Sequence, residues 1–553
     1  MRYEQAQTMP AGTIPGAEAF TISSSLMNTI HTQSFLYGED HLTISAALAI
    51  AGGTLRGVLS EKGRQQVRRG AALVEQIVAS AQVVYGINTG FGPLCTTSIN
   101  SADTARLQEN ILKSHAVGMG APIPQALSML MLVLKVHALA KGYSGIREET
   151  IDRIIWHIET GIIPVVPSQG SVGASGDLAP LAHLFLPLIG EGRVFYKKEI
   201  RPAAEVLALL QQQPLRLHAK EGLALINGTQ FIAAHAVTGV ARFHQLLMQA
   251  DLNAVLMLEG LSASGKPFYP ELHALRPFKG NQFVAATIYN LLNGSAIVQS
   301  HAHCSRVQDP YSLRCIPQVH GASRTAWLHL KELVETEINS VTDNPLLIDE
   351  ALTISGGNFH GQPLAMALDY ACLATAELGN IADRRVYLSL EGDTPGVPRL
   401  LMRSTGLNSG FMILQYTTAA LASENKSLCF PASADSIPTS LGQEDHVSMG
   451  SVSGRKLLQV LGNVEKIQAI ELLCAAQALD FHAPLKPTPI VEQLHRRIRS
   501  VIPHLEADQV LTPYLEQVQQ LVQSGTLVAL ARHIAQEEGL PYITELGNLF
   551  DTY

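Results

Sequence analysis

The residues best suited to unusual chemistry are Ala174-Ser175-Gly176, the centre of a run of small residues. Small residues allow one backbone to approach another, and glycine adopts dihedral angles that other residues avoid. Asp177 and Pro180 follow at the positions of a first helical turn, where an acid suits the helix dipole and proline is tolerated. Ser168–Leu184 therefore predicts a cramped loop that leads into a helix N-terminus.

Two interpretations of this loop follow from its residues. A tight turn or an anion-binding nest needs nothing beyond glycines ahead of a helix. The second interpretation is chemical: in a sharply bent Ala-Ser-Gly, the Gly176 nitrogen can attack the Ala174 carbonyl carbon, and loss of two waters leaves an alkene at Ser175. The product, 4-methylidene-imidazol-5-one (MIO), is a strong electrophile, which ordinary side chains do not provide.

Four side chains elsewhere each have a structural and a chemical interpretation. Tyr85 opens a glycine-rich loop as a packed aromatic, or as a base if its pKa falls from about 10. Arg314 is a surface ion-pair partner or a planar fork for a carboxylate. His115 is a cation at a helix C-terminus or a polar contact for a substrate. Glu424 lies on a long predicted helix, where it is solvated or paired with a lysine, or where it makes a second polar contact with a substrate.

The segment Ser168–Leu184 resembles the signature of the aromatic amino acid ammonia-lyases. Five companion segments follow the order of that family: Tyr85–Gly92, Leu225–Gln230, Gln308–Cys315, Gly356–His360 and Ala422–Lys426. The resemblance spans roughly residues 40 to 520. It implies a mainly α fold, an elongated helical bundle like that of the fumarase and aspartase enzymes, with an N-terminal domain that carries the MIO. It also implies a homotetramer in which each site draws on several chains.

The same resemblance implies roles for individual residues. Ala174, Ser175 and Gly176 would form the MIO, so that no external cofactor and no metal is needed. Tyr85 would remove the substrate β-proton, and Arg314 would bind the α-carboxylate. The residues implied to order the site or to pack against the substrate are Asn227, Gln308, Tyr311 (counted with the catalytic residues) and Phe359.

The pairs Ser114-His115 and Ser423-Glu424 indicate the substrate. Both are typical of the histidine-using branch of the family, and His115 and Glu424 can each hydrogen-bond an imidazole. The resemblance therefore implies conversion of L-histidine to trans-urocanate and ammonia. Some tyrosine-using relatives also carry Ser-His, so a tyrosine ammonia-lyase is an alternative. An MIO-dependent 2,3-aminomutase, which returns the amine to the β-carbon, is another.

The composition predicts extensive burial. Of 553 residues, 46% are hydrophobic and 16% charged, whereas about a quarter are charged in an ordinary protein. A net charge of −8 provides no electrostatic footprint for nucleic acid or an anionic membrane.

The apolar run Leu127–Ala140 is too short to span a bilayer, and the N-terminus lacks a signal segment. The six cysteines lie far apart like buried thiols. We expect a cytoplasmic protein.

Helical periodicity predicts the elements that hold these residues. The predicted helices are Leu42–Ala51, Glu61–Ala81, Thr104–His115, Gln125–Lys141, Glu148–Thr160, Gln230–Leu258, Asn281–Ser300, Thr325–Asn339, Gln362–Leu390, Gly410–Leu428 and Ser451–Ala478. Arg193–Ile200 predicts a small hairpin. Long helices with apolar faces pack as a bundle. We divide the chain into an arm (1–37), an MIO-bearing domain (38–225), a long-helix bundle (226–484) and a helical tail (485–553).

Two further patterns carry less weight. His301-Ala-His303-Cys304 has metal-ligating residue types, but neighbours at i and i+2 point apart on a helix, and no carboxylate lies at ligand spacing. Ser423-Glu-Asn-Lys426 matches the Ser-x-x-Lys of penicillin-binding enzymes, but its partner motifs are out of order or missing. We therefore expect neither a metal site nor a serine acyl-transferase.

Overall fold

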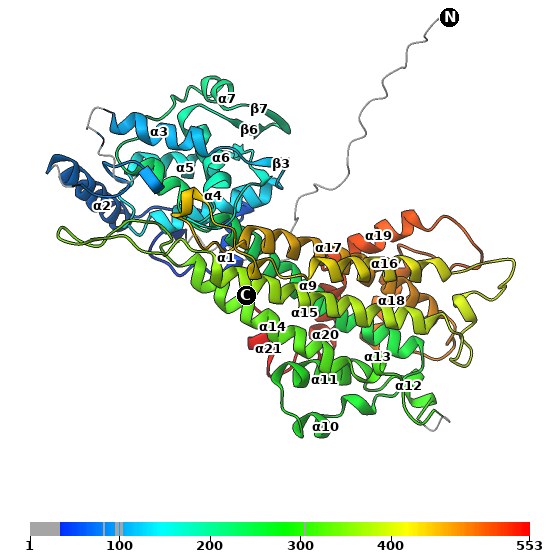
Figure 1. Ribbon diagram of the computed structural model, residues 1–553. Helices are drawn as coiled ribbons and strands as arrows, with labels where there is room; N and C mark the ends of the chain where they lie inside the picture. Colours follow the sequence, from blue (N-terminus) through cyan, green and yellow to red (C-terminus); the bar gives the residue numbers. More distant parts are fainter. Residues whose placement is uncertain (1–33, 81–82, 95–98, 100–102, 303–305) are drawn as a thin grey trace, which may run out of the picture. The chain divides into compact units, whose positions relative to one another are not determined.

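The structure, a computed structural model, describes residues 34–80, 83–94, 99, 103–302 and 306–553. Contacts group Ser34–Tyr553 as one compact unit, and the description below concerns this unit. Helices dominate it, with the strands confined to short pairs and one small three-stranded sheet (Figure 1). The mainly α fold predicted from the sequence is confirmed. The division of the unit at residues 225 and 484 stays a prediction.

The first part of the unit is arranged around helix α4 (Gln125–Leu139), whose residues from Leu127 to Leu139 are all buried. A helix that is apolar on every side must be covered on every side. Helices α1 (Ile44–Ala51), α5 (Glu148–Thr160) and α9 (Gln230–Gly260) pack against it. The remaining helices of this part are α2 (Glu61–Ala79), α3 (Thr104–His115), α6 (Leu178–Phe185), α7 (Ala203–Leu209) and α8 (Glu221–Ile226).

Short strands brace these helices. Strand β1 (Phe35–Leu36) pairs in parallel with β2 (Gly57–Val58). Two further pairs are antiparallel: β3 (Met119–Pro122) with β5 (Pro167–Gln169), and β8 (Leu346–Leu347) with β9 (Thr353–Ile354). Strands β4 (Ile163–Pro164), β6 (Arg193–Tyr196) and β7 (Glu199–Pro202) form an antiparallel three-stranded sheet in that order. The predicted hairpin is confirmed as β6–β7. Residues 34–37, assigned to the arm from the sequence, pack into the unit, because Phe35 and Tyr37 are buried edge to face.

The second part is a bundle of long helices. Its members are α9, α11 (Lys279–Leu292), α14 (Ile316–Ile338), α15 (Gln362–Ser389), α16 (Met412–Leu428) and α17 (Gly450–Asp480). Helix α17 packs along both α15 and α9, and α14 packs along α11 and α15 (Figure 1). The bundle predicted from long apolar helical faces is therefore observed.

Two helix predictions differ from the structure by more than two residues at an end. Asn281–Ser300 is not one helix: α11 ends at Leu292, and α12 (Ala296–Ser300) follows. Gly294 has a φ of +93°, which glycine adopts readily, and the Ser295 side chain accepts from the Val298 N–H to cap α12. Helix α14 begins at Ile316 instead of Thr325, with Pro317 in its first turn, where the missing N–H of proline has no cost.

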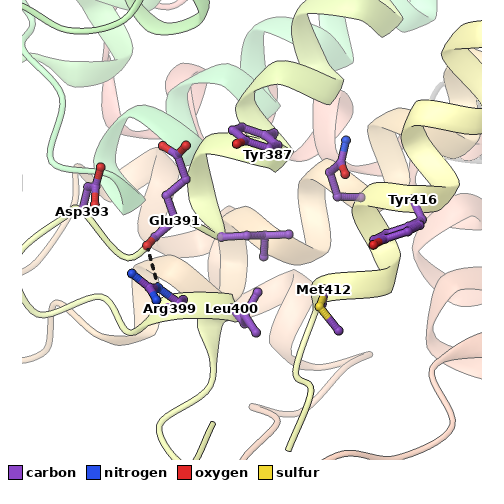
Figure 2. A pocket seen from close by; sticks show the side chains of 9 residues that line it. Tyr387, Glu391, Asp393, Arg399, Leu400, Met412 and Tyr416 are labelled. Carbon is purple, nitrogen blue, oxygen red and sulfur yellow. Dashed lines mark hydrogen bonds between the residues drawn. The ribbon is translucent and has the colours of Figure 1, made fainter. Parts of the chain in front are cut away.

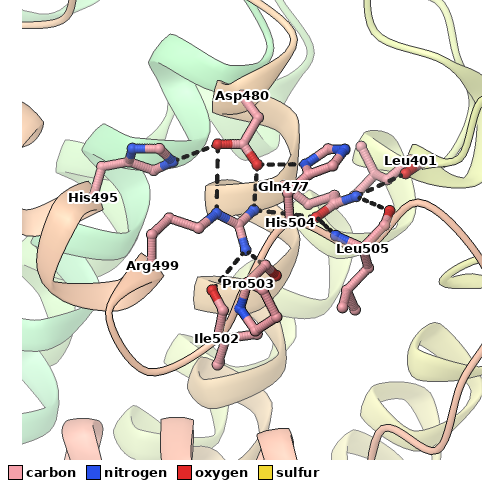
Figure 3. Close-up of polar contacts among 9 residues, drawn as sticks. All are labelled: Leu401, Gln477, Asp480, His495, Arg499, Ile502, Pro503, His504 and Leu505. Atoms are coloured by element: carbon pink, nitrogen blue, oxygen red, sulfur yellow. Dashed lines mark hydrogen bonds and ion pairs between the residues drawn. The ribbon is translucent and has the colours of Figure 1, made fainter.

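The C-terminal tail is helical, as predicted, with α18 (Pro489–Arg499), α19 (Thr512–Ser524), α20 (Thr526–Glu538) and α21 (Gly547–Phe550). Asp480, the last residue of α17, holds the start of this tail (Figure 3). Its carboxylate accepts from Arg499 Nη2 at 2.6 Å and from His504 Nδ1 at 2.6 Å, and lies 2.8 Å from His495 Nε2. One carboxylate thus connects the bundle to two segments of the tail.

Candidate active site

The Ala174-Ser175-Gly176 loop is pressed against the backbone of Gly228. Gly176 has a φ of +77°, and a Cβ on it would lie 2.1 Å from the Gly228 oxygen, so only glycine fits. The Gly228 oxygen accepts from Asp177 N at 2.8 Å, and the Gly228 N–H donates to the Ser175 oxygen at 3.4 Å. Ala174 is buried. The loop is bent and close-packed at the residues whose backbone atoms would cyclise.

Asp177 pins this loop to the start of α9. It is buried; Oδ2 accepts from Ile232 N at 3.0 Å, and Oδ1 accepts from Ser171 Oγ at 2.7 Å. Burial raises the pKa of Asp177 to about 7, although these hydrogen bonds act in the opposite direction. The acid predicted from the sequence at the start of α6 therefore lies at the end of the loop, but its acceptors serve α9 and Ser171.

Three long helices begin beside the loop. Helix α9 starts just after Gly228, α15 just after Gly361, and α17 at Gly450. A Cβ on Gly361 or Gly450 would lie 2.6 or 2.9 Å from Ile232 Cδ1, so these starts are packed closely together. Met449 N donates to the Val172 oxygen at 2.9 Å. Helix N-termini carry partial positive charge, so this arrangement favours negative charge at the loop.

Glu444 contacts the central serine. Ser175 Oγ donates to Glu444 Oε1 at 2.8 Å, and Thr439 Oγ1 donates to Glu444 Oε2 at 2.8 Å. Glu444 is not among the site residues predicted from the sequence, because no periodicity marks it and it is far from Ser175 along the chain. The available signal was its place in a polar, serine-rich turn directly before the predicted helix Ser451–Ala478.

His115, predicted to contact the substrate, lies close enough to Glu444 to be affected by its charge. Burial lowers the pKa of His115, while the Glu444 charge raises it. The imidazole Nδ1 is 3.0 Å from Ser114 Oγ. His115 ends helix α3, so the helix C-terminal interpretation describes its place in the fold. Its contact with a substrate stays a prediction, and the charge of the acid that contacts Ser175 reaches it.

Tyr85 lies in a loop that packs beside the Glu444 turn. Its hydroxyl accepts from Gly92 N at 3.2 Å. The 3₁₀ turn that begins at Gly92 contacts the turn at Ser440–Gly442, which directly precedes Glu444 in the chain. A Cβ on Gly92 would lie 3.3 Å from Ser440 Oγ. The predicted base is therefore held next to the turn that carries the acid.

Asn227 and Phe359 also belong to this neighbourhood. Asn227 is buried beside Gly228, and its Nδ2 donates to the Asn344 oxygen at 2.7 Å. Phe359 is half buried in the segment Gly356–His360, and His360 Nε2 lies 3.2 Å from the His446 oxygen. That contact places the Phe359 segment against the chain that continues from Glu444.

The predicted carboxylate-binding segment, Gln308–Arg314, lies at the opposite end of α9. Arg306 Nη1 donates to the oxygen of Leu261, the residue after α9, and Asp309 Oδ2 accepts from Ser264 N. The loop, in contrast, is bonded to Ile232 near the beginning of α9. A helix of 31 residues is about 45 Å long at 1.5 Å per residue. Within one chain, this segment cannot reach Ser175.

Gln308 and Tyr311 of that segment are exposed in the single chain, and Arg314 is half buried. Tyr311 is 69% exposed, and the Arg314 guanidinium stacks over its ring at 4.5 Å. Arg314 Nε donates to the Asp309 oxygen at 2.9 Å. Gln308 is exposed as well. The three predicted residues are thus near one another and are presented outward, about 45 Å from the loop by the length of α9.

Glu424 is exposed on α16 and is likewise distant from the loop. Its neighbour Asn425 accepts from Asn463 Nδ2 at 3.0 Å. Asn463 lies roughly 20 Å along α17 from Gly450 at 1.5 Å per residue. Of the two glutamates, Glu444 is the one that the fold of a single chain brings to Ser175. The role predicted for Glu424 depends on a neighbouring chain.

A pocket of about 550 Å³ opens near the end of α15 and the start of α16 (Figure 2). It is lined by Tyr387, Leu390, Glu391, Asp393, Arg399, Leu400, Met412, Gln415 and Tyr416. Thr394, next to Asp393, donates to the same Leu261 oxygen as Arg306. This pocket therefore lies at the Arg314 end of the bundle and is separate from the Ser175 loop.

In the part of the chain that the structure describes, no three histidine, cysteine, aspartate or glutamate residues are grouped so as to hold a metal ion. His303 and Cys304 of the possible metal cluster lie outside the described residues. No helix within the described ranges combines the length and the apolar content that crossing a membrane requires.

The geometry of a bent Ala-Ser-Gly loop at the head of a helical bundle agrees with sequence comparison. Residues 42–500 match the family described as aromatic amino acid lyase. The chain belongs to this family, and it is a carbon–nitrogen lyase. The family resemblance inferred from the loop and its companion segments is confirmed.

Within this family, the chain is similar to histidine ammonia-lyases and to an aminomutase. The chain is 47% identical to the histidine ammonia-lyase of Symbiobacterium thermophilum over 496 residues, which is 90% of this chain and 98% of that protein. The histidine ammonia-lyase of Trypanosoma cruzi has a similar solved structure, with a TM-score of 0.85 and 39% identity, covering 94% of this chain and 98% of that one. A tyrosine aminomutase of Streptomyces globisporus has a TM-score of 0.86 and 31% identity, covering 92% and 100%.

Proposed function

We propose that this enzyme removes ammonia from L-histidine to give trans-urocanate. The observation that carries the proposal is the polar contact at the centre of the loop, where Glu444 accepts from Ser175 and its charge acts on His115. A phenyl ring cannot hydrogen-bond the Glu444 carboxylate or the His115 imidazole, whereas a substrate imidazole has a donor and an acceptor nitrogen. The identity of 47% to a histidine ammonia-lyase supports the same substrate.

The loop fits the MIO that the family resemblance implies. Gly176 has no side chain between its nitrogen and the rest of the turn, and the contact with the Gly228 oxygen allows none. Ala174 is packed and Ser175 is partly open to the site. An MIO formed from Ala174-Ser175-Gly176 would supply an electrophilic alkene at Ser175. No external cofactor is needed for this chemistry.

The surrounding side chains would hold the substrate and move its protons. Glu444 and His115 would hydrogen-bond the imidazole, and Asn227 would order the wall of the site beside Gly228. Tyr85, on the loop packed against the Glu444 turn, would take the β-proton. A base fixed in this way acts as in an intramolecular reaction, which offsets the weak acidity of that proton.

A complete site would need more than one chain. Gln308, Tyr311 and Arg314 are presented outward at the far end of α9, so an Arg314 fork could bind the substrate carboxylate only at the loop of a neighbouring chain. Large apolar side chains are also exposed on the bundle: Met366, Tyr370, Leu373, Tyr387, Ile413 and Tyr416. Such a surface favours association. We propose a homotetramer, located in the cytoplasm as expected from the sequence.

A second candidate is an MIO-dependent 2,3-aminomutase, because a tyrosine aminomutase has a similar structure. Its identity of 31% is lower than the 47% to a histidine ammonia-lyase. A tyrosine ammonia-lyase is the remaining alternative.

The test of the proposed function supplies histidine, tyrosine and phenylalanine in parallel. It follows the unsaturated acids by ultraviolet absorbance and the β-amino acids by mass. Faster release of coumarate than of urocanate, or a β-amino acid as the main product, would reject the proposal.

A further inference from the structure

Lys135 is a buried cation behind the loop that the proposed function leaves without a role. It lies in the middle of α4 and is 2% exposed. Its ammonium donates a hydrogen bond to the backbone oxygen of Asn227, its one hydrogen bond among the described residues. Burial lowers the pKa of Lys135 to about 7, while the charge of Asp343 raises it.

Lys135 is not neutralised by a direct ion pair with Asp343. The Asp343 carboxylate is bonded to Lys220 Nζ at 2.7 Å, and it also accepts from Asn227 Nδ2 at 3.3 Å. A buried ammonium whose contact is a neutral carbonyl is costly for folding. Features that cost stability are concentrated at functional sites. Lys135 therefore points to a function at the peptide group that it contacts.

That peptide group leads directly to Ser175. The Asn227 oxygen accepts from Lys135, and the N–H of the same peptide, on Gly228, donates to the Ser175 oxygen at 3.4 Å. The oxygen and the N–H of a trans peptide point in opposite directions, so the ammonium and the Ser175 oxygen lie on opposite sides of one peptide plane. Hydrogen bonds in such a chain polarise one another in a low-dielectric interior.

We propose that Lys135 is a positioning residue for the formation of the electrophile: it fixes and polarises the Asn227–Gly228 peptide, and the Gly228 N–H then draws electron density from the Ser175 carbonyl. This proposal rests on the proposed function. In the dehydration step the Ser175 Cα–H and Cβ–O bonds break, a carbon–carbon double bond forms, and the proton and hydroxide leave as one water. A polarised carbonyl makes that α-proton more acidic, and the N–H contact shortens as negative charge develops on the oxygen.

The test measures the mass of the newly made full-length chain and does not depend on activity. Samples taken after synthesis is stopped should show wild-type chains losing two waters. Lys135→Met, which keeps the volume without the charge, should accumulate chains that have lost one water. Removing a direct oxyanion donor costs about 10²–10³ in rate, and Lys135 acts through a peptide, so we expect the second loss to be roughly 10-fold to 100-fold slower.

The matched control is Lys141→Met, because Lys141 follows the same helix and lacks the contact with Asn227. It should lose both waters at the wild-type rate. Lys135→Gln retains an N–H donor without a charge and should also be slow. If either Lys135 variant, shown by circular dichroism to be folded, loses both waters as fast as Lys141→Met, the proposal is overturned. Wild-type chains that never lose two waters would instead reject the proposed function.

Discussion

Ser175 and Glu444, 269 positions apart in the chain, are joined by a hydrogen bond of 2.8 Å from Oγ to Oε1. Ser175 lies in the turn before α6, and Glu444 lies in the turn before α17. The contact brings a carboxylate to the one hydroxyl that the proposed chemistry must remove. It also brings that carboxylate towards His115, whose pKa responds to it.

The first prediction concerns the mass of the purified protein. Cyclisation of Ala174-Ser175-Gly176 expels two waters, so the intact wild-type chain should weigh less than its sequence mass by that amount. Ser175→Ala lacks the hydroxyl that leaves in the second step, so this variant should lose at most one water relative to its own sequence mass. Its activity on histidine should be nearly absent. An active wild-type preparation with an unmodified mass would exclude the mechanism.

The second prediction separates the two candidate glutamates. Glu444→Gln should lower kcat/KM for histidine roughly 100-fold or more, because the half-buried carboxylate proposed to accept from the imidazole becomes a neutral amide. Glu424→Gln is its matched control. We expect a smaller loss for Glu424→Gln, since Glu424 is exposed and far from the loop of its own chain. The reverse order would return the imidazole contact to Glu424 through a neighbouring chain.

The third prediction concerns substrate choice. A site that hydrogen-bonds a polar ring rejects rings without such groups, by roughly 10⁴ in favourable cases. Histidine should therefore react far faster than phenylalanine, with tyrosine slow or inert. His115→Phe removes one polar partner and should shift the ratio of kcat/KM values towards phenylalanine. An unchanged ratio in a folded, MIO-containing variant would show that His115 does not face the ring.

The fourth prediction tests the shared site. Ser175→Ala and Arg314→Ala should each be inactive alone, but their mixed oligomers should regain part of the activity after co-refolding, because Arg314 would serve the loop of another chain. The control pair is Ser175→Ala with Tyr85→Phe. Tyr85 packs beside the Glu444 turn of its own chain, so this pair should recover little. Recovery by the control pair alone would assign Tyr85, instead of Arg314, to the neighbouring chain.

The fifth prediction concerns acid stability at the start of the tail (Figure 3). Burial raises the pKa of Asp480, but the His495 hydrogen bond and the Arg499 charge outweigh it and lower that pKa from 3.8 to about 2. The folded form therefore favours the carboxylate. This contribution is present above pH 3.8, and it is lost as the pH falls through about 2.

Removing the Asp480 carboxylate should show this dependence directly. At pH 6, Asp480→Asn should lower the free energy of unfolding by roughly 2 kcal/mol relative to wild type. The difference should shrink between about pH 4 and pH 2, measured by denaturant titrations at each pH. Glu506→Gln, an exposed acid near His504 in sequence, should change little at any pH. A difference independent of pH would mean that the carboxylate charge is not responsible.

Helix positions were largely predictable because they depend on local pattern. Thr104–His115 and Glu148–Thr160 have the bounds expected from periodicity. Helix α15 ends one residue earlier than expected, and α17 begins one residue earlier and ends two residues later. The failures were local too: Gly294 and Ser295 end and restart a helix within an apolar pattern that continues across them. Apolar periodicity records which face is buried, and it is insensitive to a single turn residue.

The residues of the site were harder to predict from the sequence than the helices. The Ala-Ser-Gly loop was identifiable because its chemistry resides in three consecutive residues. Glu444 and Lys135 were not, since one is an acid in a turn and the other a lysine within an apolar helix. Their roles arise from contacts with Ser175 and Asn227 that join distant parts of the chain. No composition or spacing encodes such contacts.

By itself, the sequence determined the family, the reacting loop and most of the long helices, because each of these is written in neighbouring residues or in their period. The tertiary structure decided which side chains meet. It placed the starts of α9, α15 and α17 around the loop, selected Glu444 over Glu424 within one chain, and set Arg314 about 45 Å away by the length of α9. Those distances follow from how rigid helices pack, and helix packing depends on the whole chain at once.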